Sequence, residues 1–327
     1  MKIIEPITIS PSEFFAFGAA PYPDYGWTHA YDLAQGVTIW DVATPYAVGA
    51  RVISTVDQAV YEAATASTGV EPTTDAVKWV RLYRSNAWRA FDGAVGNPCR
   101  GYANGGGAQT GQNTLIFCLR PMQRFDTIAL LNVRARYVVV TYENPDGEVY
   151  SRDLLTLDRT PIKDAWTYFF ADCPIQRNIV FEDLAAWVPT DLSGTGGVLT
   201  IELQSTSSEV SVGEIVIGRG KSLGVTLDGA NRRLVDYSGK DVSQYGEATL
   251  TERAYSYQTA FDVSVPLGLA SNIANAMEDI RATPVVVYPD TTSAARGLIA
   301  YGFPSDFTAT YRTTEITFAT LKIEGLI

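Results

Sequence analysis

The residues best able to do chemistry are few in this sequence. It contains one histidine, His29, and three cysteines, Cys99, Cys118 and Cys173. The cysteines form no CxxC pair, so their spacing indicates neither a zinc site nor a disulfide framework, and we expect buried thiols. No nucleophile motif such as GxSxG lies near His29, so we expect this imidazole to pack or form hydrogen bonds rather than act as a base or metal ligand. The sequence therefore predicts no histidine- or cysteine-based catalytic site.

Acidic residues are the remaining source of catalytic groups. The chain has 36 Asp and Glu residues, and two suitably spaced carboxylates can hydrolyse a glycosidic bond. Depolymerases of that kind usually contain repetitive β-helical stretches, and no repeat of about 20–50 residues is present. The glycine run at 104–107 lacks the Lys-Ser/Thr of a phosphate-binding loop. We expect a protein that is not an enzyme and uses no cofactor, with a polysaccharide depolymerase using paired carboxylates as the alternative.

Charge and hydropathy restrict the partners. The chain of 327 residues has a net charge of −11. Nucleic acid binding needs clustered Lys and Arg, so this charge argues against a nucleic acid partner. The sequence begins Met-Lys-Ile-Ile-Glu-Pro, with no apolar run of signal-peptide length, and no run of about 18 apolar residues follows. We expect a globular protein made in a reducing cytoplasm, without membrane insertion.

The positions of strand-like runs and turns predict a mainly β, multidomain fold. At this length we expect several domains, each with its own core. In chain order they are an N-terminal strand with an aromatic docking segment, a small three-stranded module, a β-sandwich or jelly roll, and a β-rich α+β domain with one helix. Their expected ranges are 1–35, 36–83, 84–222 and 223–327. Strand-like runs are expected at 37–42, 51–55, 59–63 and 78–82 in the module, and also at 168–170 and 249–255.

Four aromatic residues give the clearest spacing signal. They are Trp40, Tyr46, Tyr61 and Trp79, within a pattern that also places Gly, Val, Tyr-x-Ala and Gly-x2-Pro in order. This segment resembles the small chitin-binding-type carbohydrate-binding modules of bacterial chitinases, variants of which also occur in phage tail proteins. The resemblance implies that these four rings are the candidate carbohydrate-binding residues.

The same rings have a second role to weigh. Aromatic side chains also form the core of a fold too small to rest on aliphatic residues alone. In the modules that this segment resembles, exposed sugar-binding rings stand directly after the Tyr-x-Ala pair, where this chain has Ala64, Thr65 and Ala66. We therefore expect the fold of the module, with mostly internal aromatics and weak glycan contact. The sequence leaves open whether the rings bind glycan or only hold the module together.

The third segment opens with Asn-Ala-Trp-Arg-Ala-Phe-Asp-Gly at 86–93. Its Ala-Phe-Asp-Gly turn resembles the start of galactose-binding-like, discoidin-type sandwiches, and strand-like runs at 128–132 and 212–218 fit that family. The resemblance implies a structural calcium near the turn or a sugar in the loops, with Asp92 as the calcium candidate. An aspartate in a turn more commonly caps backbone N–H groups. No other metal ligand is indicated.

The last segment contains the one long helix that we expect, ending before the Thr-Pro pair at 283–284. Four apolar residues recur there at helical spacing: Leu269, Ile273, Met277 and Ile280. An Asp-Tyr-Ser turn at 236–238, Ala-Thr-Pro at 282–284 and a final Glu-Gly-Leu at 324–326 resemble a C-terminal segment common in phage tail proteins. The resemblance implies virion assembly rather than a reaction.

An aromatic and proline-rich stretch at 14–31 would expose apolar surface in a lone monomer, so we expect a homo-oligomer, a trimer or a ring. The resemblances imply a structural protein of a bacteriophage tail tip or baseplate, located in the virion. Its expected partners are other tail proteins, with host surface glycan as a further candidate contact. A secreted glycan-binding adhesin is a third interpretation, weakened by the missing signal peptide.

Overall fold

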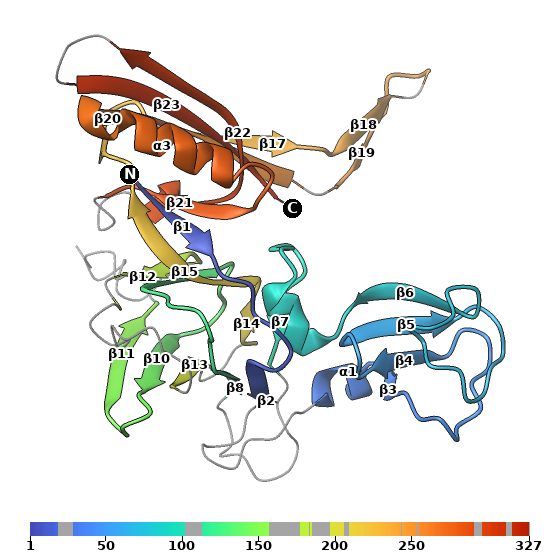
Figure 1. The fold of residues 1–327 in the computed structure, drawn as a ribbon. Coiled ribbons are helices and arrows are strands. Elements are labelled where there is room, and N and C mark those ends of the chain that lie inside the picture. Colours follow the sequence, from blue (N-terminus) through green and yellow to red (C-terminus); the bar gives the residue numbers. More distant parts are fainter. Residues whose placement is uncertain are drawn as a thin grey trace, which may run out of the picture.

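Strands predominate in the protein. The computed structural model describes residues 1–18, 29–101, 113–156, 177–182, 184, 197–205, 209–242, 244–253, 255–290, 296–311 and 316–326. Helices are few in these ranges, so the predicted mainly β fold is confirmed. Figure 1 shows a lobe containing β3–β6, a sandwich-like lobe around β8, β10 and β13, and a C-terminal sheet covered by α3. Cys173, the expected strand at 168–170 and the glycine run at 104–107 lie outside the described residues.

The module at 36–83 folds around a four-stranded sheet in the order β3-β4-β5-β6. The strands are β3 (Thr38–Ile39), β4 (Arg51–Ser54), β5 (Ala59–Ala63) and β6 (Trp79–Arg84). β3 pairs with β4 in parallel and the other pairs are antiparallel. The expected strand at 37–42 contributes only two residues, because Asp41 accepts hydrogen bonds from Ala43 and Thr44 and so caps a turn. A strand lies at each of the four expected runs, so the module described as three-stranded has a short fourth strand.

Two short helices connect this module to the sandwich: α1 (Ala30–Ala34) and the 3-10 helix η1 (Asn86–Phe91). The buried carboxylate of Asp32, on α1, accepts the backbone N–H of Asn86 at 3.0 Å. Asn86 in turn exchanges two hydrogen bonds with the backbone of Arg100 in β7 (Cys99–Arg100). These hydrogen bonds join the helices on either side of the module to each other and to β7 of the next lobe.

The sandwich-like lobe has a five-stranded antiparallel sheet in the order β11-β10-β13-β8-β2. Its strands are β2 (Phe14–Gly18), β8 (Asn113–Leu119), β10 (Tyr137–Glu143), β11 (Val149–Leu155) and β13 (Val198–Ser205). Burial alternates along β10 and β13, as expected for a sheet with one face in a core. The opposing layer consists of β12, β9 and β15, whose apolar side chains share that core.

That opposing layer is one end of a larger sheet that continues into the C-terminal region in the order β12-β9-β15-β1-β21-β22-β23-β20-β16. Its strands are β1 (Lys2–Pro6), β9 (Thr127–Leu131), β12 (Ile179–Phe181), β15 (Glu214–Ser222), β16 (Val225–Thr226), β20 (Tyr255–Pro266), β21 (Val285–Tyr288), β22 (Ala300–Tyr311) and β23 (Ile316–Gly325). The N-terminal strand β1 lies between β15 and β21. One sheet thus crosses the boundary expected near residue 222, and the division into domains stays a prediction.

The expected helix is α3 (Leu267–Asp279), which begins directly after Pro266. It lies along one face of the C-terminal sheet (Figure 1). Its Ile273 and Met277 pack in one core with Phe261 and Leu321 of the sheet. Two further short elements are β14 (Ser211–Val212), which pairs with β7, and the 3-10 helix η3 (Arg296–Leu298).

The edge of this sheet extends into a projecting ribbon, of which the sequence predicted only a strand at 249–255. It contains β17 (Asn231–Asp236), β18 (Gly239–Val242) and β19 (Ala248–Thr251). β17 pairs with the first half of β20, and β18 pairs with β19 as a separate two-stranded sheet. In Figure 1 this ribbon points away from the rest of the molecule. We call residues 231–257 the arm.

The aromatic stretch expected to expose apolar surface begins in β2, and for β2 that expectation is wrong. Phe14 and Phe17 are buried in the sandwich core and pack around Phe117 of β8. The pairing register of β2 with β8 shifts between Phe14 and Ala16, and this bulge lets two residues three positions apart face the same core. Residues 19–28 lie outside the described residues.

Candidate functional site

The four candidate sugar-binding rings lie in and around the core of the module. Tyr46, Tyr61 and Trp79 are 7%, 7% and 1% exposed, and Trp40 is partly buried against them. The rings of Tyr46 and Trp79 meet edge to face with centroids 5.5 Å apart. The expectation of mostly internal aromatics is confirmed. Whether the module binds glycan stays a prediction, but the faces of three of these rings are already covered by protein.

The polar atoms of these buried rings are used inside the module. Trp79 Nε1 donates a hydrogen bond to the carbonyl oxygen of Val70 at 3.0 Å, and the hydroxyl of Tyr46 accepts the backbone N–H of Asp41 at 2.8 Å. The hydroxyl of Tyr61 donates to Asp57 at 2.8 Å. Burial and this hydrogen bond raise the pKa of Tyr61 to about 12. These groups therefore act as structural donors and acceptors.

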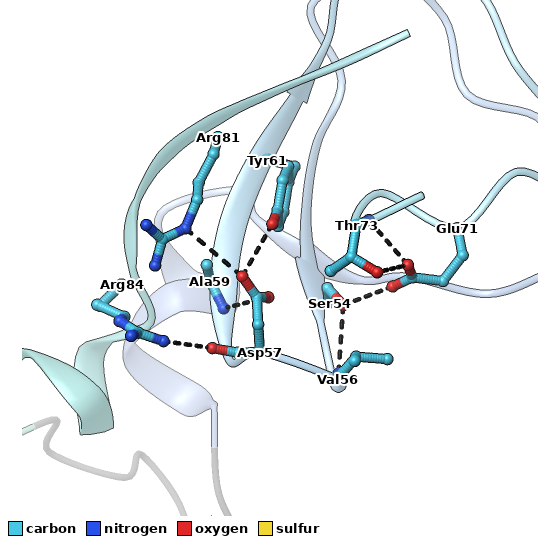
Figure 2. Close-up of polar contacts among 9 residues, drawn as sticks. All are labelled: Ser54, Val56, Asp57, Ala59, Tyr61, Glu71, Thr73, Arg81 and Arg84. Carbon is cyan, nitrogen blue, oxygen red and sulfur yellow. Dashed lines mark hydrogen bonds and ion pairs between the residues drawn. The ribbon is translucent and has the colours of Figure 1, made fainter. Parts of the chain in front are cut away.

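Asp57 organises the turn between β4 and β5 (Figure 2). Its carboxylate accepts the hydroxyl of Tyr61 and the backbone N–H of Ala59, and it lies 3.5 Å from Nε of Arg81 on β6. The guanidinium of Arg84 donates to the carbonyl oxygen of Asp57 at 2.6 Å. One acidic residue thus links the turn to two neighbouring strands, which fixes the hairpin on which Tyr61 lies.

Glu71 makes a second such link, on the other side of the hairpin in Figure 2. Its carboxylate accepts the hydroxyl of Ser54 at 2.6 Å, the backbone N–H of Thr73 at 2.8 Å and the hydroxyl of Thr73. Burial opposes ionisation, but the hydrogen bonds from Ser54 and Thr73 outweigh it and lower the pKa of Glu71. Glu71 therefore stays ionised and holds its loop against the end of β4.

The large apolar side chains on the outer surface of the module are aliphatic. Ala64, Thr65 and Ala66 are exposed, so the position expected for sugar-stacking rings presents small side chains. No aromatic residue of the module is exposed, and all of residues 36–83 are described. Its exposed large apolar residues are Ile39, Val42, Val48, Val56, Val77, Val80 and Leu82. Such side chains have no ring face to stack on a pyranose and suit contact with protein better.

Asp92, the calcium candidate, ends η1 and caps the following turn by accepting the backbone N–H of Ala94 at 2.8 Å. Glu214, a buried acid that sequence analysis missed, accepts the backbone N–H of Gly93 at 3.0 Å. Burial and the nearby charge of Asp92 raise the pKa of Glu214 to about 9. Within the described ranges, no three His, Cys, Asp or Glu residues are grouped to hold a metal ion. The calcium role of Asp92 stays a prediction.

A signal for Glu214 was present in the sequence. This acid interrupts an apolar run from Val210 to Ile217, where every neighbour in the strand faces a core. Burial, with the charges of Glu214 and Asp92, also raises the pKa of Tyr301 on β22. These groups lie where the opening turn of the sandwich meets the large sheet.

The remaining side chains that could act as nucleophiles or bases, one histidine and two cysteines, are also buried or largely so. Nδ1 of His29 lies 4.0 Å from the carboxylate of Asp32, and burial lowers the pKa of the imidazole. Cys99 and Cys118 are buried thiols, as expected. Burial raises the thiol pKa of Cys118 to about 11 and raises that of Cys99 as well. None of these groups is placed as an exposed nucleophile or base.

Comparison with known proteins adds no relative. In the parts of the chain that the structure describes, no helix has the length and apolar character to cross a membrane. No protein-family model matches the chain, and no curated protein matches it. Inference about function therefore rests on the residues and on their geometry.

Proposed function

We propose that this chain is a structural protein of a bacteriophage tail tip or baseplate that assembles with other tail proteins. The observation that carries the proposal is the presence, in one chain, of two segments that resemble parts of phage tail proteins: the aromatic module at 40–79 and the C-terminal segment ending at 324–326. The β-rich lobes support it, since their sheets present edges and faces suited to repeated protein contacts. The protein acts in the virion and is made in the host cytoplasm.

Within this proposal, the surface of the module binds protein in preference to sugar. Its aromatic rings form its core, and the large apolar side chains that it exposes are mainly valines. An aliphatic surface loses water when it meets another apolar surface, whereas a glycan needs flat rings and convergent polar groups. Host surface glycan is therefore at most a weak partner of this module.

The depolymerase alternative gains no support from the neighbouring acids Asp92 and Glu214. Asp92 and Glu214 interact electrostatically, but Glu214 is 5% exposed and accepts a backbone N–H. A polysaccharide chain has no route to such a carboxylate. Incubation with host lipopolysaccharide, capsule or peptidoglycan should release no reducing ends above a blank, whereas turnover abolished by one Asp or Glu substitution would support an enzyme instead.

Location in the particle is the direct test of the proposal. Antibodies raised against the full chain would be applied to phage particles purified from a lysate of the source culture, with pre-immune serum as the control. We expect gold label at the end of the tail, and peptides of this chain in the same particles by mass spectrometry. Particles that carry neither label nor peptides would overturn the proposal.

A further inference from the structure

The arm, residues 231–257, is a single layer of backbone with open edges. β23 pairs with β20 only from Gln258 onward, so Tyr255 to Tyr257 pair with β17 alone. Beyond them, β18 and β19 pair only with each other among the described residues. A two-stranded ribbon is at best marginally stable in water. No described strand pairs with the outer edges of β18 and β19, so these edges can accept another strand.

In the part of the chain that the structure describes, the exposed aromatic residues are concentrated on this arm. Among the described residues five tyrosines count as exposed, and four of them belong to the arm: Tyr237, Tyr245, Tyr255 and Tyr257, the fifth being Tyr137. Leu234 and Leu250 are 53% and 76% exposed beside them. Tyrosine is enriched in the energetic centres of protein interfaces. The arm thus has the composition of a contact surface.

The base of the arm is already ordered. The guanidinium of Arg232 lies 3.5 Å from the ring centroid of Tyr257 and donates a hydrogen bond to the carbonyl oxygen of Gly297 at 2.7 Å. The hydroxyls of Tyr237 and Ser256 lie 3.2 Å apart. A pre-ordered base reduces the entropy lost when the arm is immobilised by a partner.

The charge of the arm indicates which partner fits. Its basic residues are Arg232, Arg233, Lys240 and Arg253, and its acidic residues are Asp236, Asp241, Glu247 and Glu252. Four of each give a net charge of zero in a chain of net charge −11. The rest of the chain therefore carries the whole negative charge, so two copies repel each other over it, whereas two arms have no net charge to repel.

We propose that the arm is a self-association surface, on which the arm of one copy of this chain packs against the arm of a second copy. Strand edges supply hydrogen bonds, and the tyrosines and leucines supply the buried apolar area. A glycan fits this surface less well, because Arg232 covers the face of Tyr257, while Tyr255 meets the same ring edge to face at 5.5 Å. The inference concerns the purified chain and stands whether or not the protein acts in a virion.

Sedimentation velocity of the full chain over a wide concentration range tests this. We expect the wild type to associate in a concentration-dependent way. The double variant Leu234→Lys, Leu250→Lys should need a concentration at least about tenfold higher for half-association, the loss typical when central interface residues are removed. The control is Met122→Lys, since Met122 is 60% exposed outside both the arm and the module, and it should associate like the wild type. Unchanged circular dichroism and melting temperature would show that the variants fold.

Salt provides a second readout. The two arms are neutral while the rest of the chain is acidic, so raising ionic strength from about 0.05 to 0.5 M should strengthen wild-type association by screening the remaining repulsion. A wild type that stays monomeric throughout overturns the proposal, including the case in which the monomer binds a glycan or a different protein through the arm. Equal association of wild type and double variant, or equal loss in Met122→Lys, overturns it as well.

Discussion

The module and the arm use aromatic residues in opposite ways. The module hides Tyr46, Tyr61 and Trp79 and exposes aliphatic side chains, whereas the arm exposes its tyrosines and has no interior. The reason is the number of layers. In the module, loops cover one face of the sheet and close a small core, whereas the arm is a single ribbon on which several large apolar side chains are exposed. Aromatic content therefore indicates a binding surface only once the layers are known.

The largest expected effect separates these two uses directly. Trp79→Ala removes a side chain that is 1% exposed together with its hydrogen bond to Val70, and it should destabilise the module by about 3–5 kcal/mol. The matched change in the arm, Tyr245→Ala, affects a residue that is 83% exposed and should stay within about 0.5 kcal/mol. Hydrogen exchange of the β5 amides reports the local stability of the module.

Retention of exchange protection in Trp79→Ala, together with loss of binding to chitin or to host cells, would contradict this comparison. Trp79 would then be an exposed platform rather than a core residue. A large loss of stability in Tyr245→Ala would contradict the other half, because it would show that the arm has an interior of its own.

The sequence predicted the module better than the arm, for a physical reason. The aromatic residues of the module, from Trp40 to Trp79, pack in one core cluster. The spacing in the sequence and the packing in the fold therefore agree. The strands of the arm, such as β17 with the sequence Asn-Arg-Arg-Leu-Val-Asp, show no alternation of apolar residues, because neither face is buried within the chain. Glu214 escaped prediction because its role depends on a turn 121 residues away.

The free energy of unfolding should depend on pH through Glu214, which is buried on β15 of the large sheet. The pKa of Glu214 is about 9 in the folded protein and near 4.5 in the unfolded chain. Between these values the folded state retains a proton that the unfolded state has lost, so stability falls as pH rises, by up to about 1.4 kcal/mol per pH unit. Glu214→Gln removes this dependence, and the variant should be more stable than the wild type at pH 8 but not at pH 4.

Urea unfolding followed across pH 4–9 measures the difference. At pH 7, hydrogen-exchange protection of the module and self-association through the arm should be the same in Glu214→Gln and in the wild type. This would place the change in stability where the sandwich meets the large sheet. Parallel pH profiles for the two proteins would mean that Glu214 is solvated and ionises normally.

A smaller effect is expected when a single tyrosine hydroxyl group is removed, either in the module or in the arm. Tyr61→Phe removes the hydrogen bond to Asp57 within the turn of the module and should cost about 1 kcal/mol. Tyr237→Phe removes a hydroxyl near Ser256 at the base of the arm, where the ring is 45% exposed, and should cost less than about 0.5 kcal/mol. Hydrogen exchange at β5 and at β17 gives the two values, and a reversed order would refute the assignment of Asp57 as the acceptor that fixes the hairpin.

The smallest expected effect concerns sugar. The wild-type module should be retained only weakly on chitin, since Ala64, Thr65 and Ala66 offer no ring where a pyranose would stack. Because this stretch is exposed and the fold beneath it is intact, Thr65→Trp should add a flat surface without disturbing the core and should increase retention. Val77→Trp places the same ring elsewhere on the module and is the control for non-specific adhesion. If the wild type were already held firmly and Trp40→Ala released it, the partly buried ring of Trp40 would be the sugar contact, and the module would use its aromatics as the arm does, on its surface.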